Sequence, residues 1–308
     1  MLLKIKNLRI INKANIKING ITVITGDNCT GKSTICKTLF TIFDTLYDTK
    51  KEINNLCYKK ILKKNFSDVF NNQINSLSDL NSIANIVLTI KNKKTIIKFS
   101  NNKCIKLKIP RETFHNAFYI NHSSVKDLLL DLLAKDNILT DEKHSSFTQK
   151  IYTILDNIIN SNTMLQNNKY NNSIYIDNLP ISLKMFIILK LLLKQHVLKK
   201  KDILILDKPE AYLNPKWQIQ YAQIIILLQK IFDLNIIITT HSADFLTAIE
   251  YYAKKYKNIN KCKFYLAKNK DNFNTFIDVT KKTEEIYKQL FAPKFYLDKL
   301  NYELTRDK

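Results

Sequence analysis

The hydrophobic pattern alternates between strand-like and helix-like segments along most of the chain. Residues 1–24 alternate apolar and polar positions and end in the apolar run 21–24, which predicts two or three short strands. Apolar spacing then predicts a helix over 32–46 and a helical segment over 48–80. Alternation over 83–109, broken by polar turn clusters, predicts an antiparallel meander.

The second half of the chain repeats a strand-then-helix pattern. A short strand is expected at 116–120, and Leu and Ile recur at helical spacing over 123–160. Further strands are expected at 173–177, 202–206, 235–240, 263–267 and 274–278, and further helices at 181–199, 214–233, 242–257, 281–291 and 293–303. Strands that alternate with helices favour a parallel sheet, so the pattern predicts an α/β fold.

One segment between a predicted strand and a predicted helix fits the pattern G-x-x-x-x-G-K-[ST]. It reads Gly26-Asp27-Asn28-Cys29-Thr30-Gly31-Lys32-Ser33-Thr34. Two of the chain's 3 glycines fall at the two required positions, where they allow backbone N–H groups to converge on phosphate oxygens. In this P-loop, Lys32 is expected to reach the β/γ-phosphates and the Ser33 hydroxyl to bind Mg²⁺.

Two buried strands end in residues that suit the same chemistry. The apolar strand 203–206 is followed by Asp207, and an acid at this point holds Mg²⁺ in P-loop enzymes. The strand 236–240 is followed by His241, at the end of a strand where ligands gather in open α/β sheets. We therefore expect Asp207 at the metal and His241 at the γ-phosphate.

These segments resemble the ABC-type ATPase heads of the SMC, RecF and OLD-like AAA families. The resemblance is carried by the P-loop, by ILILDKPEAYLNPKWQ at 203–218 and by TTHSADFL at 239–246. Asn28 favours this branch over membrane-transporter ATPases, which usually carry Ser there. The resemblance implies a P-loop NTPase fold with an ABC-ATPase-like head, an antiparallel β-subdomain and an inserted helical lobe.

The resemblance also implies how the chain is divided and what it binds. It predicts one ATPase domain over 1–308, with a nucleotide-binding core from 1–46 and 170–280. Residues 47–169 then form the β-meander and helical lobe, and 281–308 form C-terminal helices. The implied cofactors are ATP and Mg²⁺, and the implied assembly is a homodimer that closes around two ATP molecules.

The catalytic residues of the family are matched only in part. By resemblance, Asp207 is the second Mg²⁺ group and His241 is the switch histidine. The family carries an acidic base directly after the strand Asp, whereas this chain has Lys208, and a cationic lysine does not accept a proton at neutral pH. Glu210 is the nearest remaining carboxylate and a secondary candidate for the base. Slow or impaired hydrolysis is therefore expected.

The segment that corresponds to the family's signature is also altered. It reads NLPISLK at 178–184, with Ser182 where related proteins carry glycine. Ser182 and Lys184 are candidates for contact with the γ-phosphate bound by a second copy. An ordinary helix start with a solvated lysine explains the same residues equally well.

The formal charge is 49 − 27 = +22, which suits a partner that carries phosphates. The same sequence is rich in Lys, Asn and Ile, a skew that AT-rich codons alone produce, so nucleic-acid binding stays an open alternative.

The 5 cysteines are scattered without metal-ligand spacing. No segment reaches 18 uninterrupted apolar residues, so we expect no membrane segment and a cytoplasmic location. His122, with Asn121 and Ser123, follows the strand at 116–120 and is a weaker candidate for the γ-phosphate side.

Three functions remain in order of preference. The first is a dimeric ATP-binding head with slow turnover, a nucleotide-gated sensor or scaffold for a separate effector protein, as the resemblance suggests for bacterial phage defence. The second is a DNA-metabolism ATPase of the RecF or SMC kind that binds DNA through its basic surface. The third is a transporter ATPase subunit, ranked last because the glycine-rich signature is missing.

Overall fold

The structure is a computed structural model that describes residues 1–48, 55–70, 82–100, 103–110, 115–134, 146–160, 178–270 and 273–306. Its strands are β1 (Leu2–Leu8), β2 (Ile11–Lys17), β3 (Ile21–Gly26), β4 (Ala84–Ile90), β5 (Lys93–Ser100), β6 (Lys103–Lys108), β7 (Ala117–Ile120), β8 (Ile203–Asp207), β9 (Asn235–Thr239), β10 (Cys262–Lys270) and β11 (Phe273–Asp278). Its α-helices are α1 (Lys32–Asp48), α2 (Asn55–Val69), α3 (Val125–Leu133), α4 (Ser146–Asn160), α6 (Ile181–Lys194), α7 (Pro215–Phe232), α8 (Ala243–Lys255) and α9 (Glu284–Arg306), and two 3₁₀ turns are η4 (Pro209–Tyr212) and η5 (Ile259–Lys261). The strand expected at 173–177 lies outside the described residues.

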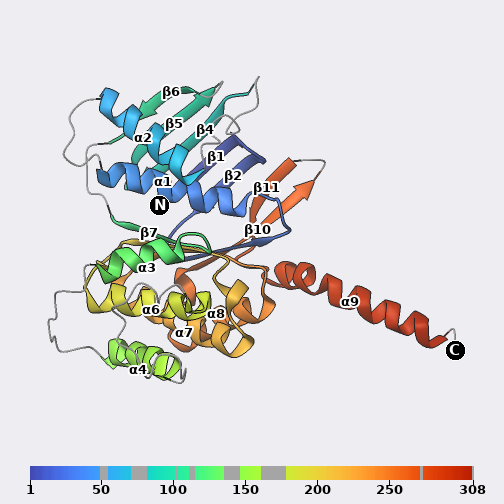
Figure 1. Ribbon diagram of the computed structural model, residues 1–308. Helices are drawn as coiled ribbons and strands as arrows, with labels where there is room; N and C mark the ends of the chain where they lie inside the picture. Colours follow the sequence, from blue (N-terminus) through green and yellow to red (C-terminus); the bar gives the residue numbers. More distant parts are fainter. Residues whose placement is uncertain are drawn as a thin grey trace.

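All of these strands belong to one mixed sheet (Figure 1). Its order is β6-β5-β4-β1-β2-β11-β10-β3-β9-β8-β7. The strands β10, β3, β9, β8 and β7 run parallel, whereas β6, β5, β4, β1 and β2 pair antiparallel. The expected α/β fold with an antiparallel β-subdomain is confirmed.

The parallel strands bring their carboxyl ends to one edge of the sheet. Asp207 at the end of β8 is in register with Thr239 at the end of β9. Ile24 in β3 is in register with the same Thr239, and Ile120 in β7 is in register with Leu206. The P-loop, Asp207 and the segment after β9, which carries His241, therefore lie at the same edge of the sheet, as the sequence pattern predicted.

Helices cover both faces of this sheet, and alternation within β8 shows how the faces are divided. Leu204 and Leu206 belong to a core that also contains α3, α4, α6, α7 and α8. Ile203 and Ile205 point to the other face and belong to a core with α1 and α2. All four side chains are fully buried, as expected for a parallel strand covered on both faces.

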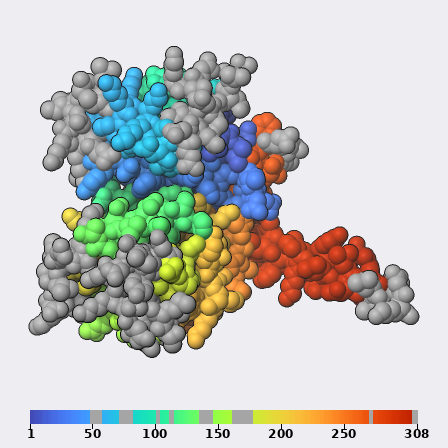
Figure 2. All heavy atoms as spheres, in the orientation of Figure 1, coloured from blue at the N-terminus to red at the C-terminus, as the bar shows by residue number. Residues whose placement is uncertain are grey.

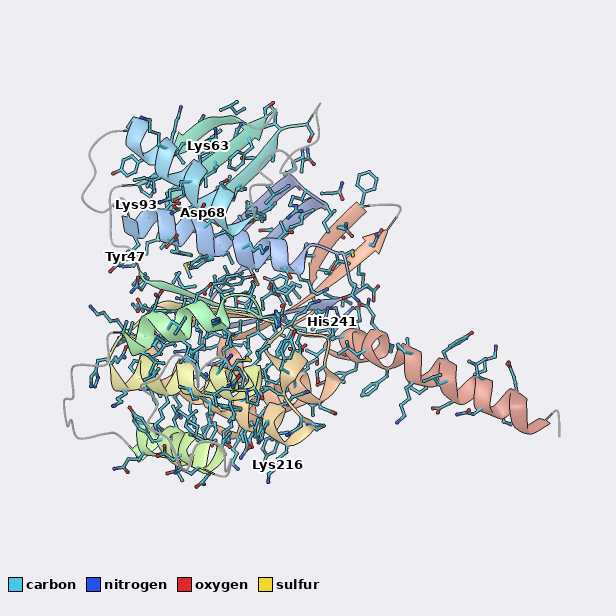
Figure 3. All side chains as sticks on the ribbon, viewed as in Figure 1. Tyr47, Lys63, Asp68, Lys93, Lys216 and His241 are labelled. Carbon is cyan, nitrogen blue, oxygen red and sulfur yellow. The ribbon has the colours of Figure 1, made fainter. Side chains whose placement is uncertain are left out.

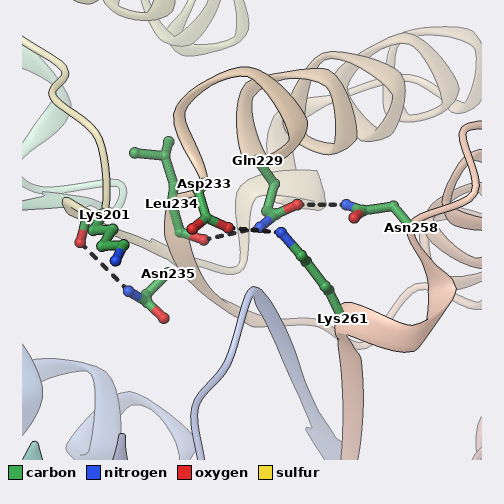
Figure 4. A network of polar contacts seen from close by, with 7 residues as sticks. All are labelled: Lys201, Gln229, Asp233, Leu234, Asn235, Asn258 and Lys261. Carbon is green, nitrogen blue, oxygen red and sulfur yellow. Dashed lines mark hydrogen bonds and ion pairs between the residues drawn. The ribbon is translucent and has the colours of Figure 1, made fainter. Parts of the chain in front are cut away.

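The opposite edge of the parallel strands is held by polar contacts (Figure 4). Gln229 on α7 accepts a hydrogen bond from the Asn258 side chain and donates to the Leu234 carbonyl oxygen at 3.4 Å. Beside it, Lys261 forms a 2.7 Å ion pair with Asp233. These contacts link the turn before β9 to the start of β10, at the end of the sheet away from the P-loop.

The C-terminal region differs from the sequence prediction. Two helices were expected at 281–291 and 293–303, but α9 is one helix with Pro293 inside it. Proline removes one helical hydrogen bond, and the exposed position lets water satisfy the carbonyl group that is freed. The distal part of α9 projects from the body of the molecule (Figures 1 and 2), so Phe295, Tyr296 and Tyr302 are more than half exposed. No helix in the described part of the chain is long and apolar enough to cross a membrane.

Candidate functional site

The P-loop depends on backbone conformations that only glycine adopts easily. Gly26 has φ +128°, and a Cβ atom there would lie 2.3 Å from the Ala267 carbonyl oxygen. Gly31 has φ +96°, and a Cβ atom there would lie 2.5 Å from Cγ1 of Ile11. The loop is therefore pressed against β10 on one side and β2 on the other, which fixes its path into α1.

The residues between the glycines form the exposed tip of the loop. Asp27, Asn28 and Cys29 are exposed, whereas the Thr30 hydroxyl turns inward and donates to the Asp27 carbonyl oxygen at 2.8 Å. Cys29 has φ +58°, an uncommon value for a residue with a side chain. Thr34 is buried in the first turn of α1, at 8% exposure. The backbone of the tip is thus left open to solvent and to a ligand.

Lys32 is buried beneath this loop and hydrogen-bonded to it. Its Nζ donates to the carbonyl oxygens of Gly26 at 2.9 Å and Asp27 at 2.5 Å, and to Oγ1 of Thr30 at 3.2 Å. Burial, followed by the nearby charge of Lys208, lowers the pKa of Lys32 to about 8. The loop therefore orders a cation that still carries most of its charge at neutral pH.

Asp207 is the centre of a hydrogen-bond cluster at the end of β8. Ser33 Oγ donates to Asp207 Oδ1 at 3.0 Å, and Thr239 Oγ1 donates to the same oxygen at 2.5 Å. The Tyr119 hydroxyl donates to Oδ2 at 3.0 Å and itself accepts from Asn121 Nδ2 at 3.0 Å. The two predicted Mg²⁺ groups, 174 residues apart in sequence, are therefore in contact.

The donor set fits Mg²⁺ rather than a transition metal. Ser33 and Asp207 offer hard oxygen atoms, which Mg²⁺ prefers, and this ion usually takes one or two carboxylates together with phosphates and water. The described residues contain no group of three or more His, Cys, Asp or Glu side chains that suits a protein-only metal site. Ser33 and Asp207 would hold the ion together with a nucleotide, and the bound ion would neutralise phosphate charge.

Lys208 follows Asp207 in an unusual backbone conformation. Its φ of 55° and ψ of 54° place it in the left-handed region, directly before Pro209. Its backbone N–H donates to the Thr239 carbonyl oxygen at 3.1 Å and to the Thr239 hydroxyl at 3.0 Å. The structure thus holds Lys208 in a fixed turn beside Asp207. Lys208 stands at the position where an acidic base was expected.

His241 and Glu210 are in contact through a backbone group. The His241 N–H donates to Glu210 Oε1 at 2.8 Å, and burial raises the pKa of Glu210. Burial, then the charges of Lys32 and Lys208, lower the pKa of His241 to about 4, so its imidazole is neutral at pH 7. Its buried Nε2 has no hydrogen-bond partner among the described residues, which suits a group that meets a ligand.

A cavity of about 250 Å³ lies next to the Ser33–Asp207 pair. Lys208 lines it together with these two residues, and Asn121 and His122 line it from the β7 side. The segment after β7 therefore approaches this part of the site. This was one of the expectations from the sequence. Glu210 does not line this cavity, because its carboxyl group is turned toward the backbone of His241.

The signature-like residues lie in the first turn of α6. Ser182 and Lys184 are 8% and 6% exposed, whereas their neighbours Ile181 and Met185 line the cavity. Neither Ser182 nor Lys184 lines the cavity beside Ser33 and Asp207. Their contact with the phosphate of a second copy stays a prediction, and it requires that buried side chains become accessible.

Comparisons with known proteins agree with this geometry at the level of the fold. An SMC head bound to the C-winged helix domain of ScpA aligns over 92% of this chain and 98% of its own, with TM-score 0.55 and 11% identity. The SMC head domain from Thermotoga maritima covers 90% and 98% at TM-score 0.46 and 9% identity. A dimeric ATP-binding cassette bound to ADP and Pi covers 86% and 93% at TM-score 0.42 and 12% identity.

No protein-family model and no curated protein matches this chain. The likeness to the SMC head spans nearly the whole of both chains, and it shows that this chain has the fold of an SMC head. At 11% identity the likeness concerns the fold alone.

Sequence reasoning missed two contributors to the Asp207 cluster. Tyr119 and Thr239 both hydrogen-bond to the carboxylate. Thr239 begins the TTHSADFL segment, but the sequence pattern assigned a role to neither residue. The signal that could have found them is strand pairing, since β7 and β9 flank β8 in the parallel sheet. A polar residue near the carboxyl end of each flanking strand is then the expected neighbour of Asp207.

Proposed function

We propose that this chain binds Mg²⁺-ATP at the P-loop edge and works as a nucleotide-occupancy switch. The observation that carries the proposal is the 3.0 Å contact between Ser33 Oγ and Asp207 Oδ1 beside the ordered Lys32. Chance matches to short motifs at distant points of a sequence have no reason to converge in space. Here they meet at the edge of the sheet where ligands bind in α/β folds.

Each part of the site has a role in this proposal. Backbone N–H groups of the loop and the N-terminus of α1 bind phosphate oxygens, and Lys32 exchanges its loop carbonyl partners for phosphate. Ser33 and Asp207 hold Mg²⁺, with Asp207 oriented by Tyr119. The neutral imidazole of His241 donates a hydrogen bond from its Nε2–H to an oxygen of the terminal phosphate.

Slow hydrolysis follows from the residue after Asp207. Among the described residues that line the cavity, Asp207 is the only carboxylate, and it is committed to three hydroxyl groups. Lys208 holds the position of the family's base and cannot accept a proton while it is charged. Bound ATP is then hydrolysed slowly, and occupancy rather than turnover is the output.

The assembly is proposed from the resemblance to ABC-type heads. Two copies close on two ATP molecules as a homodimer, with Ser182 and Lys184 of each copy near the nucleotide of the other. The closed dimer acts on a separate effector protein, as in bacterial phage-defence systems. Burial of both side chains means that α6 has to become uncovered for this contact.

Nucleotide binding and mass in solution test this proposal together. Titration of the purified protein with Mg²⁺-ATP should give saturable binding that is lost in Lys32→Ala, and sedimentation should show a dimer only with ATP. If the protein binds ATP but forms no dimer, the proposed nucleotide site stands and the proposed closing of two copies on ATP is wrong. Absence of binding in the unaltered protein would overturn the proposal.

The antiparallel subdomain supports a second candidate, which is DNA binding. Exposed lysines line α2 and strands β5 and β6, while Asp68 is the only acidic residue in the described part of α2 and β4–β6 (Figure 3). These lysines are Lys59, Lys60, Lys63, Lys64, Lys93, Lys94, Lys106 and Lys108. Such a surface attracts the phosphate backbone, and lysines also protect an edge strand such as β6 from pairing with other chains.

Salt dependence separates these two roles of the lysines. If the subdomain binds DNA, affinity should fall steeply with salt. Lys63→Ala with Lys64→Ala should then lower the slope of log affinity against log salt by about one for each DNA phosphate that the variant no longer neutralises. The matched control is Lys216→Ala at the exposed start of α7. An unchanged slope in the double variant would leave these lysines with the protective role alone.

A further inference from the structure

The cavity beside the metal pair has a cationic wall. It lies next to Ser33 and Asp207 and contains Lys208, while its remaining lining from β7 and α6 is neutral and partly apolar, as with Ile120 and Met185. The P-loop and the cavity share Ser33. A ligand that fills the loop and extends past Ser33 therefore enters the cavity next to Lys208.

The turn that carries Lys208 is fixed in three ways. Its left-handed backbone is unfavourable for a residue with a side chain, and the fold maintains it regardless. Two hydrogen bonds from its N–H to Thr239 tie it to β9, and Pro209 restricts the following backbone. The start of the side chain is therefore held in place, and a strained residue at a site edge is a reason to look for a function.

The ammonium group of Lys208 forms no ion pair or hydrogen bond with any described residue. The Asp207 carboxylate nevertheless lines the same cavity, and Lys208 lies close enough to oppose the rise that burial causes in the pKa of Glu210. The positive charge of Lys208 lowers the pKa of both Lys32 and His241, which places it in the same electrostatic environment as these two groups. Two lysines that face one site repel each other, and an anion between them removes this repulsion.

We propose that Lys208 binds the terminal phosphate of a nucleoside triphosphate in this cavity and makes the site select triphosphate over diphosphate. The inference rests on the proposed nucleotide site. A diphosphate satisfies the P-loop and Lys32 but leaves Lys208 without its anion. An acid at this position would repel the terminal phosphate and activate water, whereas lysine attracts the phosphate and activates nothing.

The test is the ratio of affinities for ATP and ADP, measured by calorimetric titration with Mg²⁺. An ATP analogue with a β,γ-imido bridge, titrated in parallel, excludes any effect of hydrolysis. Lys208→Met removes the charge with similar length, Lys208→Arg keeps the charge, and Lys216→Met is the matched exposed control. We expect Lys208→Met to weaken ATP binding about 10- to 100-fold, as for removal of a charge-assisted hydrogen bond.

The same variant should change ADP binding less than about twofold, because ADP lacks the terminal phosphate that Lys208 binds. Lys208→Arg should retain the preference for ATP, and Lys216→Met should match the unaltered protein. If Lys208→Met unfolds at a lower temperature, Lys208→Gln gives the same comparison with a polar end group.

Three results would overturn the inference. Equal losses of affinity for ATP and ADP in Lys208→Met would assign Lys208 to general electrostatics, and equal affinities in the unaltered protein would show that the site selects nothing. Unchanged ATP affinity in Lys208→Met would show that the lysine does not touch the nucleotide. If the unaltered protein binds neither nucleotide, the proposed function fails as well, and this outcome is distinct from the other three.

Discussion

The P-loop and the turn after β8 lie at the same edge of the sheet, but they differ in how they treat a phosphate. In the loop, Gly26 and Gly31 fix the backbone that is proposed to bind phosphate, and the Lys32 cation is ordered in advance by loop oxygens. In the turn, Asp207 contacts Ser33 and forms the proposed Mg²⁺ pair, while Lys208 stands where the family resemblance places a base. The comparison teaches that binding and turnover depend on separate residues, so one can be kept while the other is lost.

The most severe change on the binding side is Gly26→Ala. The added Cβ would lie 2.3 Å from the Ala267 carbonyl oxygen in a backbone conformation that disfavours side chains. We expect a loss of about 3 kcal/mol or more in the free energy of unfolding, measured by denaturant titration. Asn28→Ala at the exposed tip is the control, with an expected change within about 0.5 kcal/mol. Equal stability of the two variants would show that the loop is not pressed against β10.

Lys32→Ala should have the next largest effect. It removes the cation that meets the phosphates, and we expect ATP affinity to fall about 100-fold from the loss of charge-assisted hydrogen bonds. Titration calorimetry measures the effect, and Lys37→Ala, one turn further along α1, is the control. Comparable reductions in both variants would assign the effect to the helix rather than to the loop.

Asp207→Asn separates the metal from the nucleotide. The amide keeps the size of the side chain but lacks the charge that holds Mg²⁺, so ATP affinity should no longer rise when Mg²⁺ is added. We expect the Mg²⁺-dependent gain in affinity to drop at least about tenfold, while binding in EDTA changes little. A full Mg²⁺ response in this variant would remove Asp207 from the metal site.

Tyr119→Phe should have the smallest effect of the set. The change removes one hydrogen bond to Asp207 and keeps the ring that stacks on Phe40 at 5.5 Å between centroids. A hydrogen bond to a charged group contributes about 1.5 kcal/mol at the low end, so we expect up to about a tenfold higher Mg²⁺ requirement. The concentration of Mg²⁺ that gives half-maximal ATP affinity is the measurement, and an unchanged value would mean that Tyr119 does not orient the carboxylate.

The sequence predicted the parts of the site that are local. The P-loop, Asp207 and His241 each stand at the end of an apolar strand, so pattern and position together identified them. Tyr119 was not identified because its contact with Asp207 spans 88 residues and depends on which strands pair. Strand order is set by packing of the whole sheet, and no local pattern encodes it.

The burial of side chains on α6 and the continuity of α9 could also not be predicted from the sequence. Ser182 and Lys184 read as polar residues at a helix start, but packing of α6 covers both side chains. The pattern predicted two helices at 281–291 and 293–303, yet α9 continues through the exposed Pro293. In both cases the surroundings decided the outcome rather than the residue type.

The steady-state rate of Mg²⁺-ATP hydrolysis at saturating ATP tests the central claim most directly. The protein should turn over far more slowly than about 1 s⁻¹, the low end for enzymes. Lys208→Glu should raise the rate at least about tenfold, because a restored base contributes to water activation. A rate near 1 s⁻¹ in the unaltered protein, abolished only by Lys32→Ala, would contradict the claim and show that another residue positions the attacking water.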